Sequence, residues 1–412
     1  MKIRSAVAVL AATVAMPFGL AHATDLEVTH WWTSGGEAAA VAELAKAFDA
    51  TGNHWVDGAI AGSGGTARPI MISRITGGDP MGATQFNHGR QAEELVQAGM
   101  MRDLDSVAAE GKWTDVIRPK SLLDSCTLDG HIYCVPVNIH SWPWLWLSND
   151  AFQKVGLDVP KNWDEFVADA PKLRDAGIVP LAIGGQPWQA SGAFDVLLLG
   201  LGGKDLFYKV YKDKDAEAAA GPDMAKVFKA ANDARTMSKG TNVQDWNQAT
   251  NLVITGKAGG QIMGDWAQGE FALAGKVAGK DYSCLPGLGY DNPMIGTGGD
   301  AFYFPKLNDE AKSKAQEDLA KVLLSPETQV AFNLKKGSLP VRGDVDLAAA
   351  NDCMKKGLDI LSKGNVVDWT DQLLSADSQK QKEDLMSEFF ANESMTPEDA
   401  QKRFADIVAS AD

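Results

Sequence analysis

Residues 259–271 read Gly-Gly-Gln-Ile-Met-Gly-Asp-Trp-Ala-Gln-Gly-Glu-Phe and combine a short apolar strand with a polar and aromatic pair. The apolar segment 261–263 predicts a strand that stops at Gly264 and leaves Asp265 and Trp266 at its end. An indole can stack on the C–H face of a sugar ring, while a carboxylate accepts protons from the hydroxyl groups. The pattern therefore predicts a ligand site, suited to a sugar, at a strand end of an α/β fold.

A second stretch repeats this chemistry near the start of the chain. A strand over 26–29 is followed by the paired indoles Trp31 and Trp32, and then by a glycine turn that brings Glu37 to the start of a helix. Because both stretches place indoles and a carboxylate at a strand end, we expect them to form two walls of one cleft.

The length of the chain predicts two lobes. A single hydrophobic core rarely grows beyond about 250–300 residues, and this chain has 412. Strand and helix signals alternate, which favours an α/β fold, and the alternation restarts after the first third of the chain. The predicted elements include strands at 26–29, 55–59 and 180–183, and helices at 38–48, 66–75, 163–176 and one long helix from 310 to about 334.

Residues 1–23 have the pattern of a secretory signal peptide. Lys2 and Arg4 form a basic start, residues 5–20 are apolar, and Ala21-His22-Ala23 is a small-x-small cleavage site. The apolar run contains Pro17 and lacks a stop-transfer flank, so it does not read as a membrane anchor. We expect an exported, soluble chain that starts near Thr24 and resides in the periplasm.

The charge of the chain excludes several classes of partner. Removing Lys2 and Arg4 with the signal peptide takes the formal net charge from −15 to −17. Such an acidic surface repels phosphate backbones and anionic headgroups, so we expect neither nucleic acid nor a membrane surface as a partner. Acidity is compatible with neutral or cationic ligands, and plain solubility is the alternative explanation.

Four cysteines in an exported chain predict two disulfides. Cys126 and Cys134 flank an Asp-Gly hairpin signal, and closure across such a hairpin is easy. Cys284 and Cys353 are then left to pair with each other. Metal ligation is the alternative, but the spaced quartet of a structural zinc site is missing, and we expect neither a metal nor a cofactor.

Other strand ends and turns supply further candidate ligand residues. Gln85, Asn87 and His88 end a strand at 83–88, and Asp300 follows two glycines that let a ligand approach the backbone. Ligands of open α/β sheets sit beyond the carboxyl ends of strands, although helix capping and an exposed histidine would explain Asn87 and His88 equally well.

Several tryptophans could serve either the ligand or the core. Trp142, Trp144 and Trp146 alternate, which predicts that their rings share one face of a strand, mostly in the core. Trp188 and Trp246 also stand at the starts of predicted helices. Packing in the core is the alternative for both of them, as it is for Trp266.

These motifs carry a resemblance to a known family. The segments HWWTSGGE (30–37), VPVNIH (135–140), GGQPWQ (184–189), QIMGDWA (261–267) and KKGSLPVR (335–342) resemble the periplasmic sugar-binding proteins of bacterial ABC importers. Within the large carbohydrate group that includes maltose-binding protein, they are most similar to the glucose-binding branch. The resemblance covers essentially the whole mature chain.

The resemblance implies a two-lobe periplasmic binding protein fold of type II whose chain crosses the hinge more than once. Residues 24–136 with 291–340 would form lobe 1, and 137–290 with 341–412 would form lobe 2. A monomeric receptor would then capture glucose or a related hexose and deliver it to the permease subunits of an ABC transporter. The implied sugar contacts are Trp31, Trp32, Glu37, the polar end of the 85–88 strand, Trp266, Asp300 and Lys336, for which an exposed helix end is the alternative.

One departure from the glucose-binding relatives bears on the ligand. Those relatives resemble each other in a late histidine that bonds the sugar, whereas residues 374–379 here read Leu-Ser-Ala-Asp-Ser-Gln and no histidine follows His140. His88 could compensate, or the ligand could be a disaccharide or a glycosylated polyol. A sugar hydrolase is a distant alternative, because carboxylates in a sugar cleft serve equally well as hydroxyl acceptors.

Overall fold

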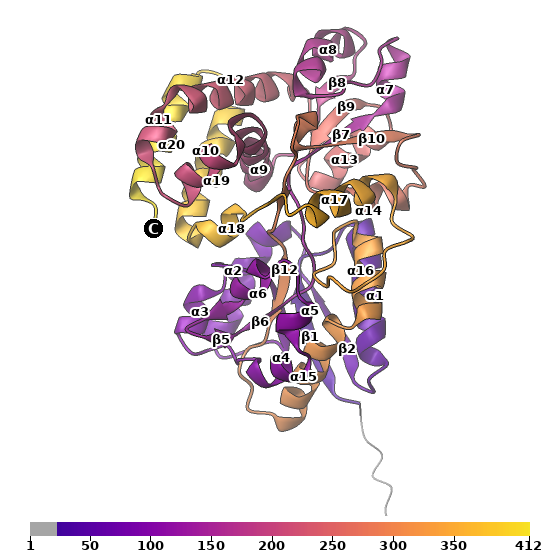
Figure 1. Ribbon diagram of the computed structural model, residues 1–412, viewed down its shortest axis with the longest axis vertical. Coiled ribbons are helices and arrows are strands. Elements are labelled where there is room, and N and C mark those ends of the chain that lie inside the picture. The colour runs from indigo at the N-terminus through magenta and orange to yellow at the C-terminus, as the bar shows by residue number, and fades with distance from the viewer. Residues whose placement is uncertain (1–22) are drawn as a thin grey trace, which may run out of the picture.

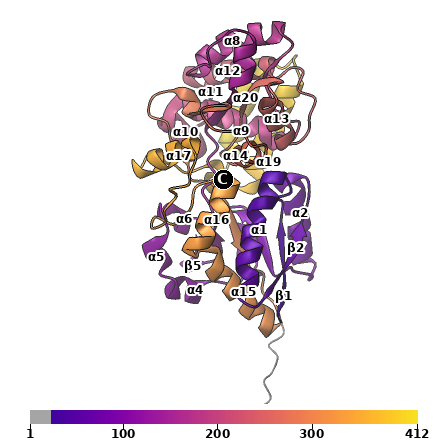
Figure 2. The ribbon, with the colours of Figure 1, turned by 90° about the vertical axis from the view of Figure 1, so that its right-hand side faces the viewer.

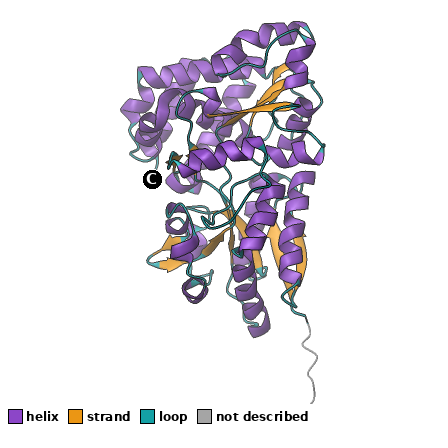
Figure 3. Cartoon of the chain, turned by 45° about the vertical axis from the view of Figure 1, so that its right-hand side comes forward, coloured by secondary structure: helices purple, strands orange, loops and turns teal. Residues whose placement is uncertain are grey.

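The computed structural model describes residues 23–412 and divides them into two lobes (Figure 1). The expected signal peptide, residues 1–23, lies outside the described residues except for Ala23. Each lobe contains its own sheet covered by helices, as Figure 3 shows, and this arrangement confirms the prediction of a two-lobe α/β fold.

The five-stranded lobe is built on a mixed sheet with the order β2-β1-β3-β12-β6. β1, β2 and β3 are parallel, while β12 runs antiparallel to both β3 and β6. The strands are β1 (Asp25–His30), β2 (His54–Ala59), β3 (Ala83–Asn87), β6 (Cys134–Pro136) and β12 (Asp300–Tyr303). β12 comes from a point in the sequence far beyond the other four, so the lobe is made of separate pieces of chain.

Helices cover this sheet, and the first of them carries part of the site. Ser34 caps α1 (Gly35–Asp49) in a capping box with Glu37, which fixes the first turn of the helix directly after β1. α1 lies beside α16 (Pro326–Lys336), as Figure 2 shows. The other helices of the lobe are α2 (Ser63–Thr76), α3 (Glu93–Gln97), α4 (Asp105–Glu110), α5 (Trp113–Val116), α6 (Ser121–Asp124) and α15 (Glu310–Leu323).

The four-stranded lobe has the strand order β10-β7-β9-β8. Its strands are β7 (Trp144–Ser148), β8 (Val179–Leu181), β9 (Ala258–Ile262) and β10 (Tyr282–Pro286). The rings of Trp144 and Trp146 stack at 5.5 Å between centroids, which confirms that they share one face of β7. Trp142 lies before the strand and outside this stack, because the strand begins only at Trp144.

The remaining helices belong to the four-stranded lobe or to its border with the first. They are α7 (Asn149–Lys154), α8 (Trp163–Asp175), α9 (Pro187–Leu197), α10 (Gly203–Tyr211), α11 (Ala216–Ala220), α12 (Pro222–Met237), α13 (Trp246–Ile254), α14 (Ala267–Leu273), α17 (Asp352–Ser362), α18 (Thr370–Leu373), α19 (Ala376–Ala391) and α20 (Pro397–Ser410). Small ladders join β4 (Thr127–Leu128) to β5 (His131–Ile132) and β11 (Ile295–Gly296) to β13 (Val366–Val367).

The chain passes between the lobes three times: between β6 and β7, between β10 and β12, and between α16 and α17. Three chain segments therefore connect the two lobes.

The expectation of one helix from 310 to about 334 is wrong. The structure has two helices there, α15 and α16, and Ser325 caps the second with its side chain on the backbone N–H of Thr328. Pro326 has no N–H and is well suited to the first position of a helix, so the chain turns at this point and starts again.

Both predicted disulfides form. Cys126 bonds Cys134 across the β4–β5 hairpin, whose Asp129 and Gly130 both have positive φ. Cys284 on β10 bonds Cys353 on α17 and so ties a late helix to the four-stranded sheet. Within residues 23–412, no helix has both the length and the apolar composition required to cross a bilayer.

The two disulfides predict different losses of stability. Replacing Cys284 and Cys353 with alanine opens a loop of 69 residues and should lower the free energy of unfolding by about 4 kcal/mol, because the unfolded chain gains loop entropy. The matched change at Cys126 and Cys134 opens 8 residues and should cost about 2.5 kcal/mol. Urea unfolding of both variants measures this, and equal losses would contradict the entropic explanation.

Candidate functional site

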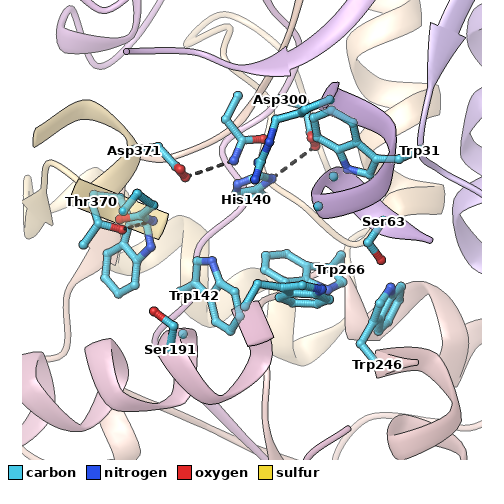
Figure 4. Close-up of a pocket in the computed structure, with 18 of the residues that line it drawn as sticks. Trp31, Ser63, His140, Trp142, Ser191, Trp246, Trp266, Asp300, Thr370 and Asp371 are labelled. Atoms are coloured by element: carbon cyan, nitrogen blue, oxygen red, sulfur yellow. Dashed lines mark hydrogen bonds and ion pairs between the residues drawn. The ribbon is translucent and has the colours of Figure 1, made fainter. Parts of the chain in front are cut away.

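A cavity lies between the lobes, where residues that follow strand ends of both sheets meet. It contains about 840 Å³ of space, counting the part open to solvent, and this is within the range of small-molecule sites. In Figure 4, Trp31 and Asp300 of the five-stranded lobe face Trp142, Trp246 and Trp266 of the four-stranded lobe. Nine of the expected ligand residues line the cavity: Trp31, Trp32, Glu37, Asn87, Trp188, Trp246, Trp266, Asp300 and Lys336.

A buried ion pair forms one wall of the cavity. Lys336 is the last residue of α16, and its Nζ lies 2.7 Å from Oε1 of Glu37 in the first turn of α1. The side chains of Lys336 and Glu37 are only 3% and 9% exposed, so Lys336 is not an exposed helix end. The ammonium group also lies 5.4 Å from the ring centroid of Trp32, which packs in the core against Phe302 and Phe332.

The carboxylate of Asp300 belongs to the same lobe and is held by three side-chain donors. Gln85 Nε2 donates to Oδ1 at 2.6 Å, while Asn138 Nδ2 at 2.9 Å and His140 Nδ1 at 3.2 Å both reach Oδ2. Burial alone would raise the pKa of Asp300, but the nearby His140 and its hydrogen bond, with help from Lys336 and Asn138, hold this pKa well below its ordinary value. Asp300 is therefore a charged group at neutral pH.

Indoles form the wall on the side of the four-stranded lobe. Trp142 meets Trp266 edge to face at 5.0 Å and Trp188 at 5.7 Å, and Trp246 lies perpendicular to Trp266 at 6.5 Å. Such edge-to-face contacts hold the rings in fixed orientations. The ring of His140 continues the series, with its centroid 5.1 Å from that of Trp266. All four of these indoles line the cavity, and Trp142, Trp246 and Trp266 are at the same time buried members of the core.

Three of the expected ligand residues lie behind the lining. Gln85 is fully buried, and its amide oxygen accepts from the backbone N–H of Trp31 at 2.9 Å while its nitrogen donates to Asp300. Asp265 accepts from the backbone N–H of Ser141 at 3.0 Å, and burial raises the pKa of Asp265 well above its ordinary value. Both side chains thus position neighbours that do line the cavity.

His88 is also buried behind the lining. Its Nδ1 lies 2.7 Å from Oγ of Ser125, which itself donates to the carbonyl of Leu122 at 2.9 Å, so the imidazole is the donor. Gly299 has no room for a side chain between this ring and Asn138, which explains why a glycine precedes Asp300. Burial lowers the pKa of His88 to about 3, so the ring is neutral at physiological pH.

One end of the cavity was not predicted from the sequence. Trp369, Thr370 and Asp371 of the α18 region line it together with Glu383 of α19. Asp371 accepts hydrogen bonds from the side chains of Asn87 and Gln91 at 2.9 Å each. The segment 368–371, Asp-Trp-Thr-Asp, again combines an indole with carboxylates, and this was the signal that could have found the region. Further missed lining residues are Ser63, Arg68, His140, Trp142, Ser191, Asp195 and Gln379.

The arrangement favours a small ligand with many hydroxyl groups and apolar C–H faces. Seven indoles and five carboxylates line the cavity. Two of the carboxylates are held by protein donors, Glu37 by Lys336 and Asp300 by Gln85. Among residues 23–412, no cluster of three or more His, Cys, Asp or Glu side chains has the geometry of a metal site.

The chain is similar in sequence to known bacterial solute-binding proteins. A family model for bacterial extracellular solute-binding proteins matches residues 32–330. A probable sugar-binding periplasmic protein of Brucella melitensis is 39% identical over 343 residues, which is 83% of this chain and 80% of the relative. A glucose-binding protein of Saccharolobus solfataricus is only 23% identical over 250 residues, 57% of this chain and 45% of that protein.

A solved structure shares the fold. The bacterial solute receptor AcbH, reported to prefer β-D-galactopyranose exclusively, superposes with a TM-score of 0.76. The sequences are 22% identical, and the match covers 93% of this chain and 98% of the receptor. The architecture of the two sheets and the repeated passage between them are therefore those of the periplasmic binding protein fold.

Breaking the buried ion pair should destabilise the protein. Lys336→Met leaves Glu37 buried without a counter-charge and should lower the free energy of unfolding by about 3–5 kcal/mol. Adding Glu37→Gln removes the unpaired charge and should restore most of this loss. Denaturant unfolding of the single and double variants measures the difference. A double variant as unstable as the single one would show that packing, not charge, determines the effect.

His88 should make the folded state sensitive to acid. As the pH falls through about 6.5, the unfolded chain binds a proton at this residue, whereas the folded protein does not until about pH 3. Stability is therefore lost with falling pH in this window, by up to about 1.4 kcal/mol per pH unit. In the variant His88→Asn, whose amide can still donate to Ser125, the unfolding free energy should depend less on pH. Parallel curves for the two proteins would contradict a neutral His88.

Proposed function

The chain belongs to the family of bacterial extracellular solute-binding proteins, which are not enzymes, and from this premise we propose that it is a periplasmic sugar receptor of an ABC importer. The ligand proposed first is glucose or a related hexose, bound between the lobes. The observation that carries the proposal is the cavity itself, in which hydrogen-bonded charged groups alternate with indole faces. The sugar-binding name of the Brucella relative supports the same class of ligand.

Two kinds of side chain in the cavity are proposed to contribute to binding in different ways. Glu37 and Lys336 offer charged acceptors and donors to hydroxyl groups, and hydrogen bonds to charged groups contribute about 1.5–3 kcal/mol each. Trp266 and Trp31 offer flat apolar surfaces to the C–H faces of the ring. Because all these groups are held in place by neighbours before the ligand arrives, little entropy is lost in ordering them.

Binding and closure of the lobes are proposed to be coupled. Contacts already join the lobes around the cavity: Glu270 Oε1 accepts from the backbone N–H of Gly36 at 2.8 Å, and Gln268 Nε2 donates to the carbonyl of Gly337 at 2.7 Å. A sugar that touches both lobes binds the closed form better than the open one and shifts the population toward it.

The closed form, presenting surface from both lobes, is proposed to be what the membrane permease recognises, with the receptor acting as a monomer. The lobe boundaries proposed remain 24–136 with 291–340 and 137–290 with 341–412. Strand membership supports them, since β12 joins the first sheet and β10 joins the second.

A disaccharide or a glycosylated polyol is the second candidate ligand. The observation that favours it is the end of the cavity near Thr370 and Asp371, beyond Trp142 and Ser191 (Figure 4). Glu383 also lines the cavity. This end has its own hydroxyl acceptors, and its residues stand on either side of segment 374–379, where the glucose-binding relatives carry their late histidine. A second ring or a glycerol arm could occupy it.

The proposal predicts that a sugar binds the purified mature protein tightly. Isothermal titration with glucose, galactose, mannose, xylose, maltose and glucosylglycerol, with tryptophan fluorescence read in parallel, tests it. Glucose or another hexose alone should bind if the first candidate is right, and only a longer or substituted sugar if the second is. Trp266→Ala should reduce the affinity at least tenfold, because the stacking surface is lost. No binding of any of these sugars to the wild-type protein would overturn the proposed function.

A further inference from the structure

His140 stands at the centre of the cavity and is held from three sides. It lies in the passage between β6 and β7, where its backbone N–H donates to the carbonyl of Gly298 at 3.0 Å. Its Nδ1 lies 3.2 Å from Oδ2 of Asp300, and its ring meets Trp266 edge to face. Figure 4 shows the ring between Asp300 on one side and the indoles of Trp142 and Trp266 on the other.

The contact with Asp300 decides which ring nitrogen can serve a ligand. An ionised carboxylate can only accept hydrogen bonds, so Nδ1 of His140 must carry a proton. In the neutral ring, Nε2 is then an acceptor with a free lone pair. Within residues 23–412, Nε2 of His140 has no hydrogen-bond partner. The fully buried polar atoms that lack a partner do not include it, so Nε2 is not sealed in the interior.

Asp300 itself has little capacity left for a ligand. Its Oδ1 accepts from Gln85 and its Oδ2 from both Asn138 and His140. Three protein donors occupy most of the roughly four acceptor sites of a carboxylate. The polar group that is available to a ligand here is therefore the imidazole of His140 and not the carboxylate of Asp300.

The other histidines near this wall do not compete for the role. His88 is fully buried and donates to Ser125, and His30 is 1% exposed and contacts Asp57. Among the residues that the structure describes, His140 is the one histidine that lines the cavity. The expectation that His88 could replace the missing late histidine is therefore not supported by its position.

We propose that His140 determines ligand specificity, with Nε2 accepting a hydrogen bond from one hydroxyl group of the sugar that stacks in this cavity. The assignment rests on the proposed function and adds a requirement that the sugar must meet. The hydroxyl opposite His140 must donate a proton, so an analogue that can only accept at that position is rejected. Asp300 acts through His140 as a positioning residue that fixes the tautomer.

The test uses deoxyfluoro analogues of the sugar that binds most tightly, each with one hydroxyl replaced by fluorine, which cannot donate. Titrations are run at mildly alkaline pH, and the same pH is used for the wild-type protein and for every variant. For the wild-type protein, fluorine at one ring position should weaken binding at least tenfold. In the variant His140→Asn, whose amide can still donate to Asp300 but does not reach the ligand, the same fluorine should cost no more than about twofold.

The matched variant His140→Gln tests the contribution of Nε2 separately from that of Nδ1. Its longer side chain can bring an amide oxygen to the position of Nε2, so it should keep part of the fluorine discrimination that His140→Asn loses. Near-ultraviolet circular dichroism and thermal unfolding show whether both variants remain folded. If only packing mattered, the two variants would lose affinity for the parent sugar and for every fluorinated analogue by the same factor.

Nitrogen-15 spectra of the imidazole give a readout that does not depend on the variants. The Nδ1–H tautomer is expected for His140, with a shift of the Nε2 resonance when sugar is added. An Nε2–H tautomer, or equal fluorine penalties in wild type and His140→Asn, would overturn the assignment and leave the proposed function intact. If the wild-type protein binds no sugar, the proposed function fails and this assignment fails with it.

Discussion

The carboxylate of Asp300 is the charge on which the cavity is built. A buried anion is stable only when donors replace the water that it has lost, and here the donors come from two other parts of the chain. Gln85 reaches it from β3, while Asn138 and His140 reach it from the passage into the second lobe. Gln85 in turn holds the backbone N–H of Trp31. One charge therefore sets the positions of an indole, an imidazole and the start of an interlobe connection.

The second buried charge system works in the same way but joins helices. Glu37 and Lys336 lie 299 residues apart in sequence and meet because α1 and α16 pack side by side. The pair costs desolvation energy, and a hydrophobic pair of the same size would serve stability equally well or better. At the cavity wall the pair presents an anion and a cation, and both groups can exchange hydrogen bonds with hydroxyl groups.

Much of the fold could be predicted because its signals are local. Hydrophobic alternation, glycine turns and the Asp129-Gly130 hairpin each depend on a few neighbouring residues, and the strands and the Cys126–Cys134 disulfide followed from them. Cys284 and Cys353 were paired only because they were the two cysteines left. The break at Pro326 was missed because helical signals continue on both sides of it, although the proline itself marks a new helix start. In the site, pairs of an indole and a carboxylate near strand ends pointed to Trp31, Glu37 and Trp266, all of which line the cavity.

The sequence by itself determined the residue chemistry: an α/β chain with strand ends that carry indoles and carboxylates, and cysteines spaced to bond. Which polar groups face the cavity depends, in contrast, on the tertiary structure. His88 and His140 look alike in sequence, yet one is sealed behind Gly299 and the other lines the cavity. Which of them is sealed depends on contacts between segments more than a hundred residues apart, such as that of His140 with Asp300. No local pattern encodes such a contact, because it is fixed by how the sheets and their connections pack.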